Sequence, residues 1–136
     1  MKSAVAMVVF LSMLTAACSA SEPAEELPAE ELPAESGCAD VTAVEVHAEG
    51  DGTHRFAVTV LSPDTGWDKY ADAWHVSDTG GTVLGERILA HPHVDEQPFT
   101  RSLSGVVVPD GVTDVVVTAR DSVVGSCGAS LTVAIP

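Results

Sequence analysis

Residues 44–60 read VEVHAEGDGTHRFAVTV, and the alternation in this stretch decides the fold class of the chain. Small or branched apolar residues take every second position from Val44 to Ala48, with Glu or His between them. The alternation resumes from Phe56 to Val60, after the glycine-rich segment Gly50-Asp51-Gly52. A period of two residues is typical of a strand with one buried face, and a Gly/Asp turn between two such runs predicts a β-hairpin.

Further runs of the same kind follow to the end of the chain, at residues 73–77, 82–89, 99–108, 115–120 and 130–135. Turn sequences rich in Gly, Pro and Asp separate them. We therefore expect an all-β fold, an immunoglobulin- or fibronectin type III-like antiparallel β-sandwich of about seven strands, with a small open barrel as the alternative. Trp74 is expected to be buried on the third strand, and the segment from Ser62 to Asp72 to hold one short helical turn.

The N-terminus predicts export. Residues 1–17 hold Lys2 and then an apolar run from Ala4 to Ala17, which suits a signal peptide and is too short to span a bilayer. The stretch Leu14-Thr15-Ala16-Ala17-Cys18 resembles a bacterial lipobox, although Thr15 stands where that motif usually has Leu. The resemblance implies cleavage before Cys18 and its acylation, palmitate included, and two or more acyl chains anchor a protein stably. The alternative is cleavage after Ala20 and a secreted soluble protein.

Residues 18–37 form the second predicted part, the lipidated Cys18 and an acidic Pro/Ala/Glu tether that reads SASEPAEELPAEELPAESG over 19–37. Proline at every fifth position prevents a continuous helix, and the glutamates keep the segment solvated. We expect a disordered spacer, with a binding strip for a basic partner as the alternative. The third part, residues 38–136, is the β-sandwich domain.

Cysteine usage agrees with an oxidising compartment. The chain has three cysteines, and lipidation of Cys18 would leave Cys38 and Cys127 as one pair. Their disulfide would span 127 − 38 = 89 positions and join the approach to the first strand with the approach to the last. The alternative is two buried or unpaired thiols.

His91-Pro92-His93 is the sharpest candidate for a metal site. Two imidazoles at positions i and i+2 of an extended segment point to the same side, with Asp95 and Glu96 within reach. His75 could complete the ligand set, and mixed nitrogen and oxygen ligands suit copper or zinc. The alternative is a turn-rich segment whose histidines have structural roles.

The loop that follows Ser62 carries Trp67 and Tyr70, which could form an exposed aromatic platform for a glycan or a peptide. Equally, both rings could close the core. Asp64, Asp68 and Asp72 offer oxygen ligands for calcium, though at a spacing unlike that of an EF-hand. The repeated Asp-Thr-Gly at 64–66 and 78–80 matches the aspartic protease signature, but both copies fall where hairpin turns are expected, so we exclude that class.

Three stretches, HPHVDEQPFTRSLSGV (91–106), TGWDKYADAW (65–74) and TARDS (118–122), resemble a family of short uncharacterised bacterial envelope proteins. The resemblance covers residues 54–136 and implies a compact envelope domain. The resemblance assigns no catalytic residue to this chain.

The net charge of −14 disfavours nucleic acid and anionic lipid as partners. From the N-terminus and the strand pattern we expect a lipid-anchored periplasmic sandwich without a cofactor. Because Ser19 follows the lipidated cysteine, we expect it in the outer membrane of a Gram-negative host. It would act as a non-catalytic binding or structural module, and its partner would be an envelope protein or a cell-wall component. The alternative is a copper- or zinc-binding lipoprotein that uses His91 and His93. A carboxylate-based hydrolase is a weaker alternative.

Overall fold

The structure is a computed structural model and describes residues 37–136. The predicted signal peptide, Cys18 and the acidic tether up to residue 36 lie outside the described residues. The predictions for them therefore remain predictions. Within the described part, no helix could span a membrane.

Seven strands make up the described domain, which contains no helix: β1 (Asp40–Ala48), β2 (His54–Leu61), β3 (Ala71–Asp78), β4 (Val83–Ile88), β5 (Phe99–Val106), β6 (Asp114–Asp121) and β7 (Leu131–Ala134). The expectation of an all-β domain with about seven strands is confirmed. The hairpin predicted from residues 44–60 is the β1–β2 pair, in which Val46 lies opposite Phe56.

The helical turn expected between Ser62 and Asp72 is wrong. Gly66 and Lys69 instead form an isolated β-bridge around a tight turn at Trp67-Asp68. Gly66 has a φ of +141°, a backbone conformation that only glycine adopts without strain and that a helix cannot contain.

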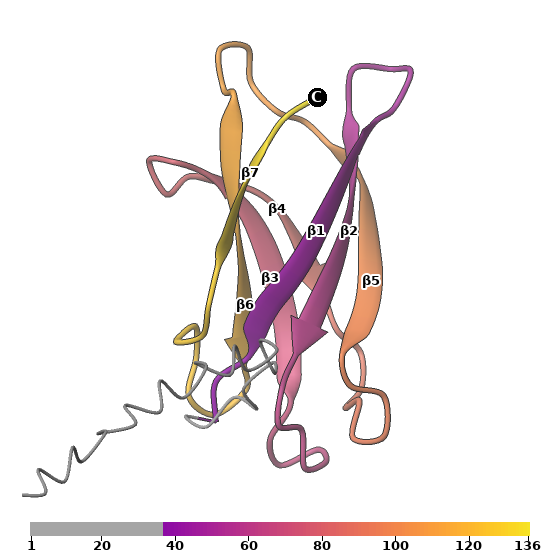
Figure 1. The fold of residues 1–136 in the computed structure, drawn as a ribbon, viewed down its shortest axis with the longest axis vertical. Helices are drawn as coiled ribbons and strands as arrows, with labels where there is room; N and C mark the ends of the chain where they lie inside the picture. The colour runs from indigo at the N-terminus through magenta and orange to yellow at the C-terminus, as the bar shows by residue number, and fades with distance from the viewer. Residues whose placement is uncertain (1–36) are drawn as a thin grey trace, which may run out of the picture. The chain divides into compact units, whose positions relative to one another are not determined.

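The strands form two antiparallel sheets in the orders β1-β2-β5 and β4-β3-β6-β7 (Figure 1). Their inner faces share one hydrophobic core, to which β2 contributes Phe56 and β6 contributes Val117. Trp74 on β3 is fully buried, as predicted. Burying a side chain such as Phe56 or Val117 contributes about 1.5–3 kcal/mol to stability.

One end of the two sheets gathers the N-terminal approach to β1 and three connections, residues 62–70, 89–98 and 122–130 (Figure 1). We call this the loop end. The disulfide between Cys38 and Cys127 lies here, with the two Cα atoms 5.4 Å apart, and joins the approaches to β1 and β7 as predicted. The loop end is therefore tied both by the sheets and by a covalent bond between segments far apart in the chain.

Candidate functional site

Asp64 joins two connections of the loop end. Its side chain is buried, and one carboxylate oxygen accepts a hydrogen bond from the Ala71 amide while the other accepts one from the His93 amide, both at 2.9 Å. Gln97 adds a second link, because its Oε1 accepts from the Ser62 amide at 2.9 Å and its Nε2 donates to the His93 carbonyl at 3.0 Å. These bonds hold the segment 89–98 against the segment 62–70.

His93, predicted as a metal ligand, is buried with only 4% of its surface exposed. Its ring stacks on Phe99 at a centroid distance of 3.8 Å, and the His91 ring lies 4.5 Å from it. Neither ring nitrogen of His93 has a hydrogen-bond partner among the described residues. Burial chiefly lowers the pKa of His93, and the neighbouring charges of Arg101 and His91 lower it further. His93 therefore packs as a neutral aromatic ring.

An open hollow of about 500 Å³ lies over these loops, lined by Gly66, Trp67 and residues 91–96. Trp67 is 70% exposed, and Tyr70 braces it edge to face with the ring centroids 5.7 Å apart. The aromatic platform and the histidine cluster were two separate predictions from the sequence. The structure places Trp67, His91 and His93 around one hollow.

Carboxylates line one side of the hollow. Glu96 forms an ion pair with Arg101 at 3.0 Å, and this hydrogen bond lowers the pKa of Glu96. Arg101 itself lies 5.7 Å from the centre of the Phe99 ring. Asp95, which also lines the hollow, is exposed. The charge of Glu96 is compensated by Arg101, so it is the exposed carboxylate of Asp95 that makes the hollow favour neutral or cationic groups over anions.

The proposed metal ligands are only partly brought together. His75 lies on β3 opposite Glu86 and Thr118, and its side chain shares their face of the sheet, whereas Trp74 beside it points into the core. Among residues 37–136, no group of three or more His, Cys, Asp and Glu side chains is placed to hold a metal ion. Of the predicted set, His91 and His93 are neighbours and Glu96 is engaged by Arg101.

Asp64, Asp68 and Asp72, considered as an alternative set of calcium ligands, do not form a metal-binding group among residues 37–136. Both oxygens of Asp64 bind backbone amides, and Asp72 pairs with Arg120 at 2.8 and 3.2 Å. Asp64 lies in the loop, Asp68 in the tight turn and Asp72 on β3, so the even spacing of the aspartates in the sequence does not bring their side chains together.

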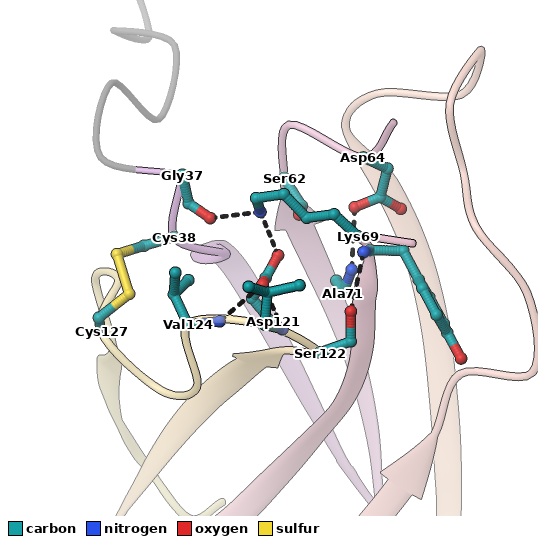
Figure 2. A network of polar contacts seen from close by, with 12 residues as sticks. Gly37, Cys38, Ser62, Asp64, Lys69, Ala71, Asp121, Ser122, Val124 and Cys127 are labelled. Atoms are coloured by element: carbon teal, nitrogen blue, oxygen red, sulfur yellow. Dashed lines mark hydrogen bonds and ion pairs between the residues drawn. A yellow bond between two sulfur atoms is a disulfide. The ribbon is translucent and has the colours of Figure 1, made fainter. Parts of the chain in front are cut away.

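A second polar network at the loop end was not expected from the sequence (Figure 2). Lys69 donates to Asp121 and, at 2.6 Å, to the Gly37 carbonyl. The Asp121 side chain is fully buried, and its other oxygen accepts from the amides of Val123 at 2.8 Å and Val124 at 3.1 Å. The sequence does contain a signal for the burial of Asp121, because this residue continues the alternation that places Val115, Val117 and Ala119 in the core.

The network determines the charge state of Asp121. Burial alone raises the pKa of this carboxyl, but the hydrogen bonds from Lys69 and from the amides of Val123 and Val124 outweigh it and hold the pKa below its usual range. The ionised carboxylate thereby joins the start of the domain, the segment 62–70 and the β6–β7 connection.

We expect His93 to make the stability of the domain pH-dependent. Because the pKa of His93 is lowered in the folded state, His93 binds a proton more readily in the unfolded chain than in the folded chain. The free energy of unfolding should therefore fall as the pH is lowered through about 6.5, the ordinary pKa of histidine. Denaturant titrations between pH 5 and 8 measure this slope. His93→Leu should flatten it, and His47→Gln, at an exposed position of β1, should not. Equal slopes in the wild type and His93→Leu would contradict the assignment.

The fold and the site thus define a small antiparallel β-sandwich module with an open hollow at its loop end. The chain is similar to a protein of Halomicrobium mukohataei named "Putative lipoprotein", with 40% identity over 95 residues. The match covers 70% of this chain and 46% of that protein, so the chain spans about half the length of the curated relative it matches. No protein-family model and no solved structure matches the chain.

Proposed function

We propose that this chain is an envelope lipoprotein, acylated at Cys18, whose sandwich is a non-catalytic binding or structural module. The observation that carries the proposal is the hollow at the loop end. Trp67, which is largely exposed, and the pair His91 and His93 line it, and the bonds of Asp64 fix the loops that hold them. An exposed and braced aromatic ring beside a hollow is suited to binding, since it offers a large contact area at a low cost in conformational entropy.

The two buried carboxylates argue for binding over hydrolysis. A general acid or base needs a pKa near the working pH and a free position for the proton. The pKa of Asp121 is lowered instead, and both of its oxygens are engaged. Both carboxylate oxygens of Asp64 likewise accept hydrogen bonds from backbone amides. Neither group is available as a catalyst, which supports the non-catalytic role over the carboxylate-based hydrolase.

The finer parts of the proposal concern location and partner. The lipobox resemblance and the serine after Cys18 favour the outer membrane of a Gram-negative host, facing the periplasm. The acidic surface of the domain favours envelope components over nucleic acid as partners.

We also assign the sandwich to the fibronectin type III-like variety. In the constant-type immunoglobulin arrangement the fourth strand belongs to the sheet of the first, second and fifth strands. Here β4 pairs with β3, in the sheet that also holds β6 and β7. This strand order supports the assignment.

Removing the acylated cysteine tests the anchor. In cells that make the full chain, the wild type should partition into the detergent phase of a cloud-point extraction and should carry acyl chains on its N-terminal peptide by mass spectrometry. Cys18→Ala should lose the acyl mass and move to the aqueous phase, whereas Ser19→Ala should behave as the wild type. A wild-type N-terminus at Ser21 without acyl chains would favour cleavage after Ala20 and would overturn the anchor.

Metal handling is the second candidate, because the rings of His91 and His93 lie 4.5 Å apart. The metal-free full chain would be titrated calorimetrically with copper(II) and with zinc. We expect weak heats that are the same in the wild type, in His91→Ala and in the control His47→Ala. Stoichiometric submicromolar binding that only His91→Ala loses would instead place metal handling first.

A further inference from the structure

Large apolar side chains are unusually exposed at the loop end. Each of its three connections carries at least one: Trp67 is 70% exposed and Val94 50%, and the third connection carries two, Val123 at 63% and Val124 at 46%. Monomeric proteins rarely leave several large apolar groups together in water unless the surface has an interaction to make. None of the four side chains belongs to the core cluster, so the packing of the two sheets does not depend on them.

The three tips are held as one surface. A β-bridge between Gly66 and Lys69 closes the first tip, and one between Asp121 and Gly125 closes the tip that carries Val123 and Val124. The segment 62–70 contacts both of the others.

Hydrogen bonds join these neighbouring tips. On one side Asp64 accepts from the His93 amide, and Trp67 and Val94 line the same hollow. On the other side the Ser122 amide donates to the Tyr70 carbonyl at 2.9 Å, and the Tyr70 amide donates to the Ser122 hydroxyl at 3.2 Å. The apolar tips are therefore presented by a braced framework.

The chain enters the domain at this same end. Gly37, the first described residue, is bonded through its carbonyl to Lys69, two positions from Trp67 (Figure 2). Residues 19–36 lie between it and Cys18, and even fully extended they reach only about 60 Å. An acyl chain on Cys18 would thus keep the loop end within reach of the bilayer that holds it.

The opposite end differs in character. Its turns at 50–53 and 78–82 are made of Gly, Asp and Thr. Its exposed large apolar residues among those described are Val83 at the start of β4 and Val107 in the β5–β6 connection, against the four at the tips of the loop end. The charges of the loop end specify the kind of lipid. Asp68 and Asp95 are exposed, whereas Glu96 is paired with Arg101 and Lys69 is paired with Asp121, so a zwitterionic surface is favoured over an anionic one.

We propose that the loop end is a membrane-contacting surface, on which Trp67, Val94, Val123 and Val124 enter the interfacial layer of the bilayer. Tryptophan prefers this layer, where its ring is buried and its N–H stays near polar groups. The inference rests on the proposed acylation of Cys18, because four apolar side chains beside acidic residues bind too weakly to hold a protein on a membrane alone.

The two tryptophans make the test selective, since Trp67 is exposed and Trp74 is fully buried. The full acylated chain would be reconstituted into phosphatidylcholine vesicles containing a nitroxide-labelled phosphatidylcholine. We expect the chain to float with the vesicles and the emission of Trp67 to shift to the blue and be quenched. Trp67→Tyr, which retains only Trp74, should show no quenching. Vesicles with anionic lipid should give less quenching.

A pair of matched variants tests the surface itself. Val123→Asp should reduce the quenching of Trp67, whereas Val107→Asp should leave it unchanged, because Val107 is equally exposed (64%) but lies at the opposite end. Flotation without quenching would overturn the inference while the anchor stands. Failure to float would overturn both. A blue shift without nitroxide quenching that grows with protein concentration would assign the surface to a second copy of the chain.

Discussion

Replacing Asp121 with alanine should lower the free energy of unfolding by about 3 kcal/mol, the lower end of the range for breaking a buried ion pair. The lower end applies because Lys69 keeps 23% of its side chain exposed and can turn toward water. The amides of Val123 and Val124 lose their acceptor in the same variant. Denaturant titration at neutral pH measures the loss.

Asp121→Asn is the matched control. Its side-chain oxygen can still accept from the two amides, but it carries no charge to pair with Lys69. The free energy of unfolding should therefore lie between those of the wild type and Asp121→Ala. A change below about 1 kcal/mol in Asp121→Ala would mean that the network contributes no more than an exposed salt bridge does.

The stabilisation by the same network depends on pH in the acid range. The lowered pKa of Asp121 means that its stabilisation is fully present above about 3.9, the ordinary pKa of an aspartate, and is lost as the pH falls below it. This window lies below that of His93, so titrations at pH 3–5 and at pH 5–8 separate the two groups. Asp121→Ala should lose less stability than the wild type between pH 5 and pH 3.

Removing the disulfide with the double substitution Cys38→Ser/Cys127→Ser should lower the free energy of unfolding by about 4–5 kcal/mol. The disulfide joins residues 89 positions apart. Without it the unfolded chain has a higher conformational entropy, so unfolding becomes more favourable, and the effect is larger for a longer loop. Such a loss is a large share of the stability of a small domain. Denaturant titration of the oxidised wild type against the variant gives the difference.

Two controls separate the disulfide from other effects of the cysteines. Cys18→Ser should leave the free energy of unfolding unchanged, since Cys18 lies outside the described sandwich. A reducing agent should lower the stability of the wild type to nearly that of the double variant. If it leaves the denaturation midpoint of the wild type unchanged, the disulfide does not form in solution.

Both perturbations act where the function is proposed. The disulfide and the Lys69–Asp121 pair hold the start of the domain and the β6–β7 connection at the loop end. The tips that carry Trp67 and Val123 extend from these fixed points. A variant that weakens the network should therefore disturb the membrane contact more than it disturbs the β1–β2 hairpin at the opposite end.

Much of the fold follows from the sequence by itself. The two-residue alternation placed the strands, because every second side chain of a strand in a two-layer fold must be apolar. The same reasoning predicted the burial of Trp74, and the number of cysteines predicted the pair Cys38 and Cys127. The sequence also predicts the lipid anchor at Cys18, and that prediction rests on a local motif and awaits the acylation experiment.

Only the tertiary structure decided which of the candidate residues meet. It brought Trp67 to the hollow of His91 and His93, and it placed His75 on the face of β3 that points away from the core. It also paired Lys69 with Asp121, 52 positions away, and with Gly37, 32 positions away. Spacing along a chain specifies the face of a strand, whereas contacts between loops depend on sheet order and register, which arise when the whole core packs.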